Sequence, residues 1–231
     1  VELRCVPGEG VQEAQTLLLL APAEGQRPER VAQGLGLAES PVPTLSARDG
    51  LRADLARLRE RERFLADAAR PEAVAKRHAL GLRTARENIA DLCDADSFIE
   101  YGALAVAAQR SRRSAEDLIA NTPADGMVTG IGSVNGTTFG AQRSRTVVMA
   151  YDATVLAGTQ GLRNHAKTDR LLGIALAQRL PVVLLAEGGG GRPGDTDMPI
   201  VAGLQVGTFA SFARLSGQVP VVGLAAGRCF A

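Results

Sequence analysis

Four consecutive glycines mark the part of the sequence that is best suited to chemistry. They lie in the segment Glu187–Asp195, after an apolar run and before a run of helical character. Each glycine costs backbone entropy on folding, so four in a row need a reason. Their backbone N–H groups have no side chain in the way, and the following helix adds a positive field at its N-terminus. The segment therefore predicts an anion site, with a loop that is merely flexible as the simpler alternative.

Three kinds of anion site can be compared for this loop. Gly189, Gly191 and Gly194 have the spacing of a dinucleotide fingerprint, but Pro193 removes one donor and no acid follows the next apolar run to hold a ribose. A phosphate-binding P-loop is excluded because the chain has no Gly-Lys-Ser/Thr after the glycines. The third kind is an oxyanion hole, in which backbone amides stabilise an enolate or thioester oxygen. We favour this third interpretation.

Side chains offer no obvious catalytic set in its place. The sequence has no Gly-x-Ser-x-Gly elbow. His165 lies in a helical stretch without a recognisable nucleophile, so it is more often a polar surface residue than a base. Glu187, Asp195 and Asp197 could be paired carboxylates for acid–base work, but their spacing does not show that they converge. With two histidines and no Cys-x-x-Cys, no metal site is expected.

The composition is that of a globular protein that works in water. Of 231 residues, 45% are hydrophobic and 22% are charged. The net charge of +1 gives no field that would attract nucleic acid or an anionic membrane. No apolar run reaches the length of a membrane span. We therefore expect neither nucleic acid nor membrane as a partner, and a cytoplasmic location.

Four regions follow one another along the chain. Residues 1–22 read as short strands, and residues 23–47, rich in Pro and Gly, as an extended linker. Residues 48–76 form a charged helical segment whose helix should end at Pro71 and dock by one face. Residues 77–231 have the texture of one compact α/β domain. The docking face would carry Leu51, Leu55, Leu58 and Leu65. The chain starts without Met and stops directly after an apolar run, so we expect a fragment of a longer protein.

Within the α/β region, apolar periodicity and turn signals predict the elements. Asn135-Gly136 is a hairpin signal. We expect the two runs on either side of the glycine loop to be neighbouring parallel strands, buried on both faces. The expected helices are 84–92, 161–179 and 199–216, and the expected strands are 97–101, 128–134, 137–141, 146–150, 181–186 and 219–225.

Several motifs in residues 77–231 agree in order and spacing with one family. They are Leu82–Ile89, Asp96–Tyr101, Asp125–Gly132 with Asn135-Gly136, Asp152–Val155, Gly158-Thr159 with Lys167 and Arg170, Gly188–Arg192, and Gly227–Ala231. The region resembles the carboxyltransferase family of biotin-dependent acyl-CoA carboxylases, as in the β subunits of propionyl-CoA and methylcrotonyl-CoA carboxylase. The resemblance implies a crotonase-like superhelix of ββα turns with its active site at a subunit interface. Residues 1–22 resemble, over a shorter stretch, the last strands of a biotinyl domain, which implies a fused protein.

The resemblance implies transfer of a carboxyl group from carboxybiotin to the α-carbon of an acyl-CoA. The amides of Gly189, Gly190 and Gly191 would form the oxyanion hole. Residues implied in substrate binding are Gly188, Arg192, Gly158, Thr159, Lys167 and Gly227. One departure from the family pattern is Gly188, where the family usually has Ser.

The same resemblance implies cofactors and partners outside these residues. Biotin would be attached before residue 1, and a biotin carboxylase domain would use ATP and bicarbonate. A C-terminal carboxyltransferase domain of a neighbouring subunit would complete the site in a homo-oligomer, so the chain alone should be inactive. Two alternatives remain: another crotonase-fold hydratase or hydrolase with two carboxylates, such as Glu187 and Asp195, aimed at the substrate, or a non-catalytic scaffold subunit.

Overall fold

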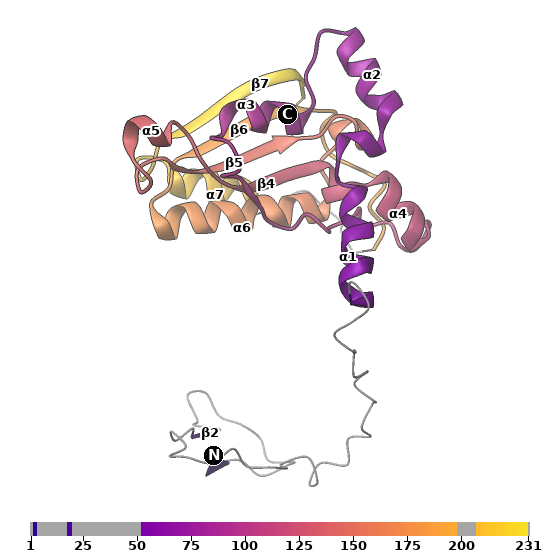
Figure 1. Ribbon diagram of the computed structural model, residues 1–231, viewed down its shortest axis with the longest axis horizontal. Coiled ribbons are helices and arrows are strands. Elements are labelled where there is room, and N and C mark those ends of the chain that lie inside the picture. Colours follow the sequence, from indigo (N-terminus) through magenta and orange to yellow (C-terminus); the bar gives the residue numbers. More distant parts are fainter. Residues whose placement is uncertain (1, 4–17, 20–51, 198–206, 231) are drawn as a thin grey trace. The chain divides into compact units, whose positions relative to one another are not determined.

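The structure is a computed structural model that describes residues 2–3, 18–19, 52–197 and 207–230 (Figure 1). The chain divides into two compact units, residues 1–49 and 50–231. In the first unit, strands β1 (Glu2–Leu3) and β2 (Leu18–Leu19) pair antiparallel, within the region expected to form short strands. The expected linker at 23–47 lies outside the described residues. No described helix is long and apolar enough to cross a bilayer.

The second unit is built on one five-stranded sheet. Its strands, in spatial order, are β3 (Ile99–Glu100), β4 (Met127–Ser133), β5 (Arg145–Tyr151), β6 (Val182–Gly188) and β7 (Val221–Cys229). The first three strands pair antiparallel and the last three pair parallel. Val182 pairs with Val221 and Leu185 with Leu224, so the expected parallel neighbours are confirmed.

Helices lie on both faces of this sheet (Figure 1). Side chains of successive residues point to opposite faces of a strand. Val147 accordingly packs with the helix α6 (Leu162–Gln178) and with Leu215 of α7 (Thr208–Leu215). Val148 packs on the other face with Ile89 of α3 (Ala85–Leu92). The remaining helical segments are α1 (Ala53–Arg63), η1 (Asp67–Ala69), α2 (Pro71–Ala79), α4 (Ala115–Asn121), η2 (Pro123–Gly126), α5 (Gly136–Phe139) and η3 (Leu156–Gly158).

The expected helices at 84–92 and 161–179 are confirmed as α3 and α6. A capping box starts α3, in which the Thr84 side chain accepts from the Glu87 amide and the Glu87 side chain accepts from the Thr84 amide. For the expected helix at 199–216, the described part is α7, and residues 199–206 lie outside the described residues.

The expected strand at 137–141 is wrong, because the short helix α5 occupies this stretch. Asn135 adopts a left-handed φ of 55°, and the amide of Gly136 donates to the Asp94 carboxylate at 2.7 Å. Together these contacts turn the chain into a helical turn. Strands β4 and β5 then pair directly, with Ser133 opposite Arg145, so Asn135-Gly136 is not a two-residue hairpin turn.

The expected helix across 48–70 is interrupted. Helix α1 ends at Arg63, and Pro71 begins α2 instead of ending a helix. Proline suits this first helical position because its missing N–H has no partner there. The expectation of docking by leucines is also wrong for the described ones in α1, since Leu55 and Leu58 are exposed and no residue of α1 is buried.

Strand β7 is not buried on both faces as expected. Val221, Val222 and Leu224 are all exposed, whereas Val182 of β6 is fully buried. The reason is position, because β7 is the outermost strand of the described sheet and β6 lies between it and β5. The apolar run therefore predicted β7 and its pairing with β6, but it did not predict how far β7 is buried.

Candidate active site

The glycine loop begins where β6 ends, against the turn that contains Gly158. Gly188 and Gly190 have φ values of 156° and 79°, and Gly158 has a φ of 66°. A Cβ at Gly188 would collide with the Gly158 carbonyl, and a Cβ at Gly158 would lie 2.9 Å from the Gly188 Cα. Only glycine permits this backbone-to-backbone approach. The sequence-predicted residues Gly158 and Gly188 therefore lie together as a steric pair.

The amides of the loop divide into two groups. The Gly189 amide donates to the Ala157 carbonyl at 3.1 Å, so the loop itself uses it. The Gly190 carbonyl accepts from the Gln160 amide at 2.8 Å, and these two bonds tie the loop to η3 and to the segment that follows it. The amides of Gly190 and Gly191 donate no hydrogen bond to any other described residue. Of the three expected donors, these two are available for a ligand.

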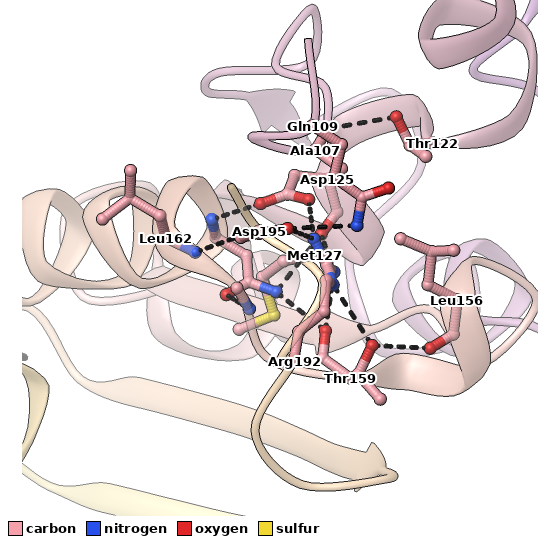
Figure 2. Close-up of polar contacts among 12 residues, drawn as sticks. Ala107, Gln109, Thr122, Asp125, Met127, Leu156, Thr159, Leu162, Arg192 and Asp195 are labelled. Carbon is pink, nitrogen blue, oxygen red and sulfur yellow. Dashed lines mark hydrogen bonds and ion pairs between the residues drawn. The ribbon is translucent and has the colours of Figure 1, made fainter. Parts of the chain in front are cut away.

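Arg192, at the end of the loop, points into the protein (Figure 2). Its side chain is 4% exposed, and it forms an ion pair with Asp125, whose side chain is 0% exposed. It also donates to the carbonyl of Thr159 at 2.7 Å and to the Thr159 hydroxyl at 3.2 Å. Burial raises the pKa of Asp125, and the neighbouring Arg192 opposes this effect. Arg192 and Thr159, both expected to bind substrate, contact each other.

Lys167 lies on α6 and its ammonium group is buried. It donates to the carbonyls of Ala124, at 2.9 Å, and of Met127. Burial lowers the pKa of Lys167 to about 8. Ala124 and Asp125 have left-handed φ values of 53° and 52°, so the lysine holds an unusual turn in place. That turn, η2, carries the aspartate that pairs with Arg192.

Gly227 lies in β7, in extended backbone, and faces the carboxylate of Glu187. A Cβ at this position would overlap the Glu187 side chain. Glu187 is buried and accepts two hydrogen bonds from Arg77 of α2, at 2.9 and 2.7 Å. Gly227 therefore leaves room for a buried ion pair directly before the glycine loop.

The three candidate carboxylates have separate partners. Glu187 pairs with Arg77, Asp195 accepts from the Leu162 amide at 2.9 Å, and Asp197 accepts from the Ser111 amide at 3.0 Å. Each carboxylate is thus committed to holding backbone or an arginine. No acid–base pair of the kind that a hydratase or hydrolase needs is formed by them.

His165 contacts a neighbouring helix. Its Nδ1 lies 3.0 Å from the Thr208 hydroxyl of α7, and burial lowers the pKa of its imidazole. The residue is half-buried, so the expectation of a surface position holds only in part. Its hydrogen bond joins α6 to α7, and this contact indicates a packing role.

Sequence reasoning missed two residues that hold the loop. Asp125 belongs to a motif that was noted only as a match to the family, and Arg77 lies 110 positions before its partner Glu187. Asn164 also supports the site, because its amide donates to Asp125 at 2.8 Å and its side-chain oxygen accepts from the Gly161 amide at 2.9 Å. For Arg77 no local signal exists, since an isolated arginine on a helix resembles any solvated one.

The chain is similar to a known protein family and to several known proteins. A family profile described as carboxyl transferase domain matches residues 76–231. The propionyl-CoA carboxylase β chain of Saccharopolyspora erythraea is 33% identical over 196 residues, which cover 84% of this chain and 33% of that protein. The biotin-dependent long chain acyl-coenzyme A carboxylase β4 subunit of Mycobacterium tuberculosis is 33% identical over 175 residues, which cover 76% of this chain and 30% of that protein. This chain thus spans about a third of the length of these curated relatives.

Solved structures agree with the sequence relatives. A single-chain, multi-domain long-chain acyl-CoA carboxylase matches with a TM-score of 0.74 at 62% identity, over 79% of this chain and 18% of that one. The β subunit of geranyl-CoA carboxylase from P. aeruginosa matches with a TM-score of 0.57 at 29% identity, over 74% of this chain and 29% of that one. The α/β fold with its ββα unit of β4, β5 and α6 is the crotonase-like fold of these carboxyltransferases. By its sequence, its fold and the arrangement of its glycine loop, the chain belongs to the carboxyl transferase domain family.

Proposed function

We propose that this chain is part of the carboxyltransferase of a biotin-dependent acyl-CoA carboxylase, and that its glycine loop stabilises the thioester enolate of the acyl-CoA. The observation that carries the proposal is that the amides of Gly190 and Gly191 donate to no other described residue, whereas the Gly189 amide and the Gly190 carbonyl are bonded to Ala157 and Gln160. Backbone donors held in place before the reaction are the usual way in which enzymes stabilise such an oxyanion. The relatives that match this chain are named as acyl-CoA carboxylase subunits.

The reaction needs an α-carbon that loses a proton and forms a bond to the incoming carboxyl carbon. As the proton leaves, its electron pair spreads onto the thioester oxygen, where the amides of Gly190 and Gly191 would donate. When the α-carbon bonds the carboxyl carbon, the thioester carbonyl re-forms. Biotin, when bound, would supply the carboxyl group, whose bond to the ureido nitrogen breaks, and that nitrogen would take up the proton from the α-carbon. This fits the site, because its carboxylates are committed to arginine or to backbone amides.

The wider organisation belongs to the same proposal. Residues 1–22 would be the end of a biotinyl domain, residues 23–47 a linker, residues 48–76 a charged helical segment, and residues 77–231 the first part of the carboxyltransferase domain. A biotin carboxylase domain would use ATP and bicarbonate to load the biotin. A C-terminal carboxyltransferase domain of a neighbouring subunit would complete the acyl-CoA site in a homo-oligomer, in the cytoplasm. Two names support this organisation: one relative is named a biotin-dependent acyl-coenzyme A carboxylase subunit, and one similar structure is described as a single-chain, multi-domain acyl-CoA carboxylase.

Gly191 offers the cleanest test of the oxyanion hole. Unlike Gly190, it has no left-handed φ, and a Cβ there would meet nothing within 4 Å. Gly191→Pro deletes the amide donor, whereas Gly191→Ala keeps it and serves as the matched control. In the full-length protein that carries this chain, we expect Gly191→Pro to reduce carboxyl transfer to acyl-CoA by about 100- to 1000-fold. Gly191→Ala and His165→Ala should remain much closer to the parent protein.

The assay should measure the two half-reactions separately. Biotin carboxylation should stay intact in every variant, which shows that biotin is loaded, and circular dichroism of each variant shows whether the carboxyltransferase part is folded. A Gly191→Pro protein with normal carboxyl transfer would contradict the role of the Gly191 amide. If carboxyl transfer collapsed only in His165→Ala, the catalytic group would lie on α6 and not in the glycine loop.

A further inference from the structure

The side chain of Arg192 bonds to other residues of the domain, although Arg192 directly follows the four glycines. Its three nitrogens make five hydrogen bonds, two to Asp125, two to Thr159 and one to Asp195. A guanidinium has five N–H donors, so none is left for a substrate. The residue therefore differs from the substrate-binding arginine that its place in the loop suggests.

We propose that Arg192 is a positioning residue, which fixes the direction of the Gly191 amide by clamping the end of the glycine loop onto Thr159 and Asp125. This inference rests on the proposed function, because it names the group that keeps the oxyanion donors in place. Arg192 does not touch the substrate in this account, and it acts only through the loop.

The backbone around Gly191 shows how the clamp reaches the amide. The carbonyl of Gly190 accepts from Gln160 at 2.8 Å, and the amide of Arg192 donates to the Gln160 carbonyl at 2.7 Å. Gly191 lies between these two bonds, in a parallel bridge with Gln160. The side chain of Arg192 bonds to Thr159, and its backbone amide bonds to the adjacent Gln160. Side chain and backbone therefore hold the same two neighbouring residues. With both peptide neighbours tied, the Gly191 N–H is directed away from Gln160.

The residues that Arg192 bonds to are themselves held by hydrogen bonds from Asn164. Asp125 accepts from the Asn164 amide at 2.8 Å, and the Asn164 side chain donates to the Thr159 carbonyl at 3.2 Å. Gly161 leaves the space that the guanidinium occupies, since a Cβ there would lie 2.6 Å from Nη1. A planar fork that bonds two directions at once is a property of arginine that lysine lacks. Lysine at this position would keep the charge beside Asp125 and lose the geometry.

The test is Arg192→Lys in the full-length protein. We expect carboxyl transfer to fall by about 10- to 100-fold in kcat, as for a misplaced catalytic group, with little change in the Kd of acyl-CoA. The matched control is Arg70→Lys, because Arg70 also forms a buried ion pair, with Asp152 at 3.1 Å, and makes no hydrogen bond to the glycine loop. Arg70→Lys should lower the melting temperature about as much as Arg192→Lys does. It should leave kcat near that of the parent.

Hydrogen exchange at residues 188–192 gives a readout that does not depend on catalysis. We expect faster exchange there in Arg192→Lys and not in Arg70→Lys. Unchanged exchange in Arg192→Lys would overturn the clamp, whereas a parent protein without carboxyl transfer would overturn only the proposed function. Weaker acyl-CoA binding with normal kcat would make Arg192 a substrate ligand and would also overturn the clamp.

A second variant covers the case in which Arg192→Lys does not fold. Asp125→Asn combined with Arg192→Met removes both charges, so no buried carboxylate is left without its partner. This double variant should fold and still show the loss in kcat and the faster exchange of the loop. A folded double variant with parental kcat and exchange would overturn the proposal.

Discussion

Helix α1 and the walls of the glycine loop contain the same kinds of charged residues in opposite surroundings. In α1 and directly before it, the side chains of the pairs Arg63–Glu60 and Arg52–Asp54 are each between 59% and 79% exposed. At the loop, Arg192 and Asp125 are 4% and 0% exposed, and Arg77 and Glu187 are 10% and 8% exposed. The charged residues are of the same types in both regions, so residue type alone does not show which of them are buried. Charged residues therefore support the site where tertiary contacts remove them from water.

The effect of removing one partner of an ion pair depends on whether the pair is exposed or buried. An exposed pair is screened by water and holds two flexible side chains, so its net contribution is small. A buried pair is no more stabilising than a well-packed apolar replacement, but the loss of one partner leaves a charge without compensation. We therefore expect the free energy of unfolding to change little when both partners of a buried ion pair at the loop are replaced. It should fall strongly when only one partner is replaced.

Arg77→Met should have the largest effect on stability, and it tests most directly whether the buried pairs differ from the exposed ones. It leaves the buried Glu187 carboxylate without its guanidinium, and we expect a loss of about 3–5 kcal/mol in the free energy of unfolding. Urea denaturation of the parent and the variant measures this loss. The control is the double variant with Glu187→Gln, which removes both charges and should recover part of it. A loss below about 1 kcal/mol in the single variant would place Arg77 with the exposed arginines.

The buried Lys167 should make the stability of the protein depend on pH, as an exposed lysine would not. Burial lowers the pKa of Lys167 from 10.5 to about 8. Between these two values the unfolded chain holds the proton and the folded chain does not, so stability rises with pH in this window. Relative to Lys167→Met, the parent should gain up to the order of 3 kcal/mol from pH 8 to pH 10.5.

Urea denaturation at several pH values between 7 and 10.5 tests this prediction. The chain offers one matched control, since Lys76 is its only other lysine and is exposed. Lys76→Met should leave the pH dependence of the parent unchanged. A parent and a Lys167→Met variant with parallel pH profiles would show that the folded protein keeps the ammonium charged throughout.

The smallest effect is expected in α1. Arg63→Ala removes an exposed partner of Glu60, and we expect a change within about 0.5 kcal/mol in the free energy of unfolding. The same denaturation experiment measures it. A loss comparable to that of Arg77→Met would show that the exposed pair in α1 contributes as much to stability as the buried pair at the glycine loop.

Local patterns predicted the framework of this protein. Apolar runs located β6 and β7 and their parallel pairing, and helical periodicity located α3 and α6. The turn of α5 was mispredicted as a strand because its cause is distant: the Asp94 carboxylate accepts from Gly136 across 42 positions. Local periodicity also could not tell that β7 is an outer strand, since an apolar run reads the same at the edge and at the centre of a sheet.

The position of the loop and its need for glycine follow from the amino-acid sequence, because backbone freedom and the absence of a side chain are properties of single residues. Which amides are left without a partner depends on tertiary contacts. Gly189 is occupied because η3 brings the Ala157 carbonyl to it, while Gly190 and Gly191 have no such neighbour among the described residues. Only the tertiary structure likewise buried Arg192 and paired Arg77 with Glu187. Burial and pairing depend on which distant segments meet, and no stretch of local sequence contains that information.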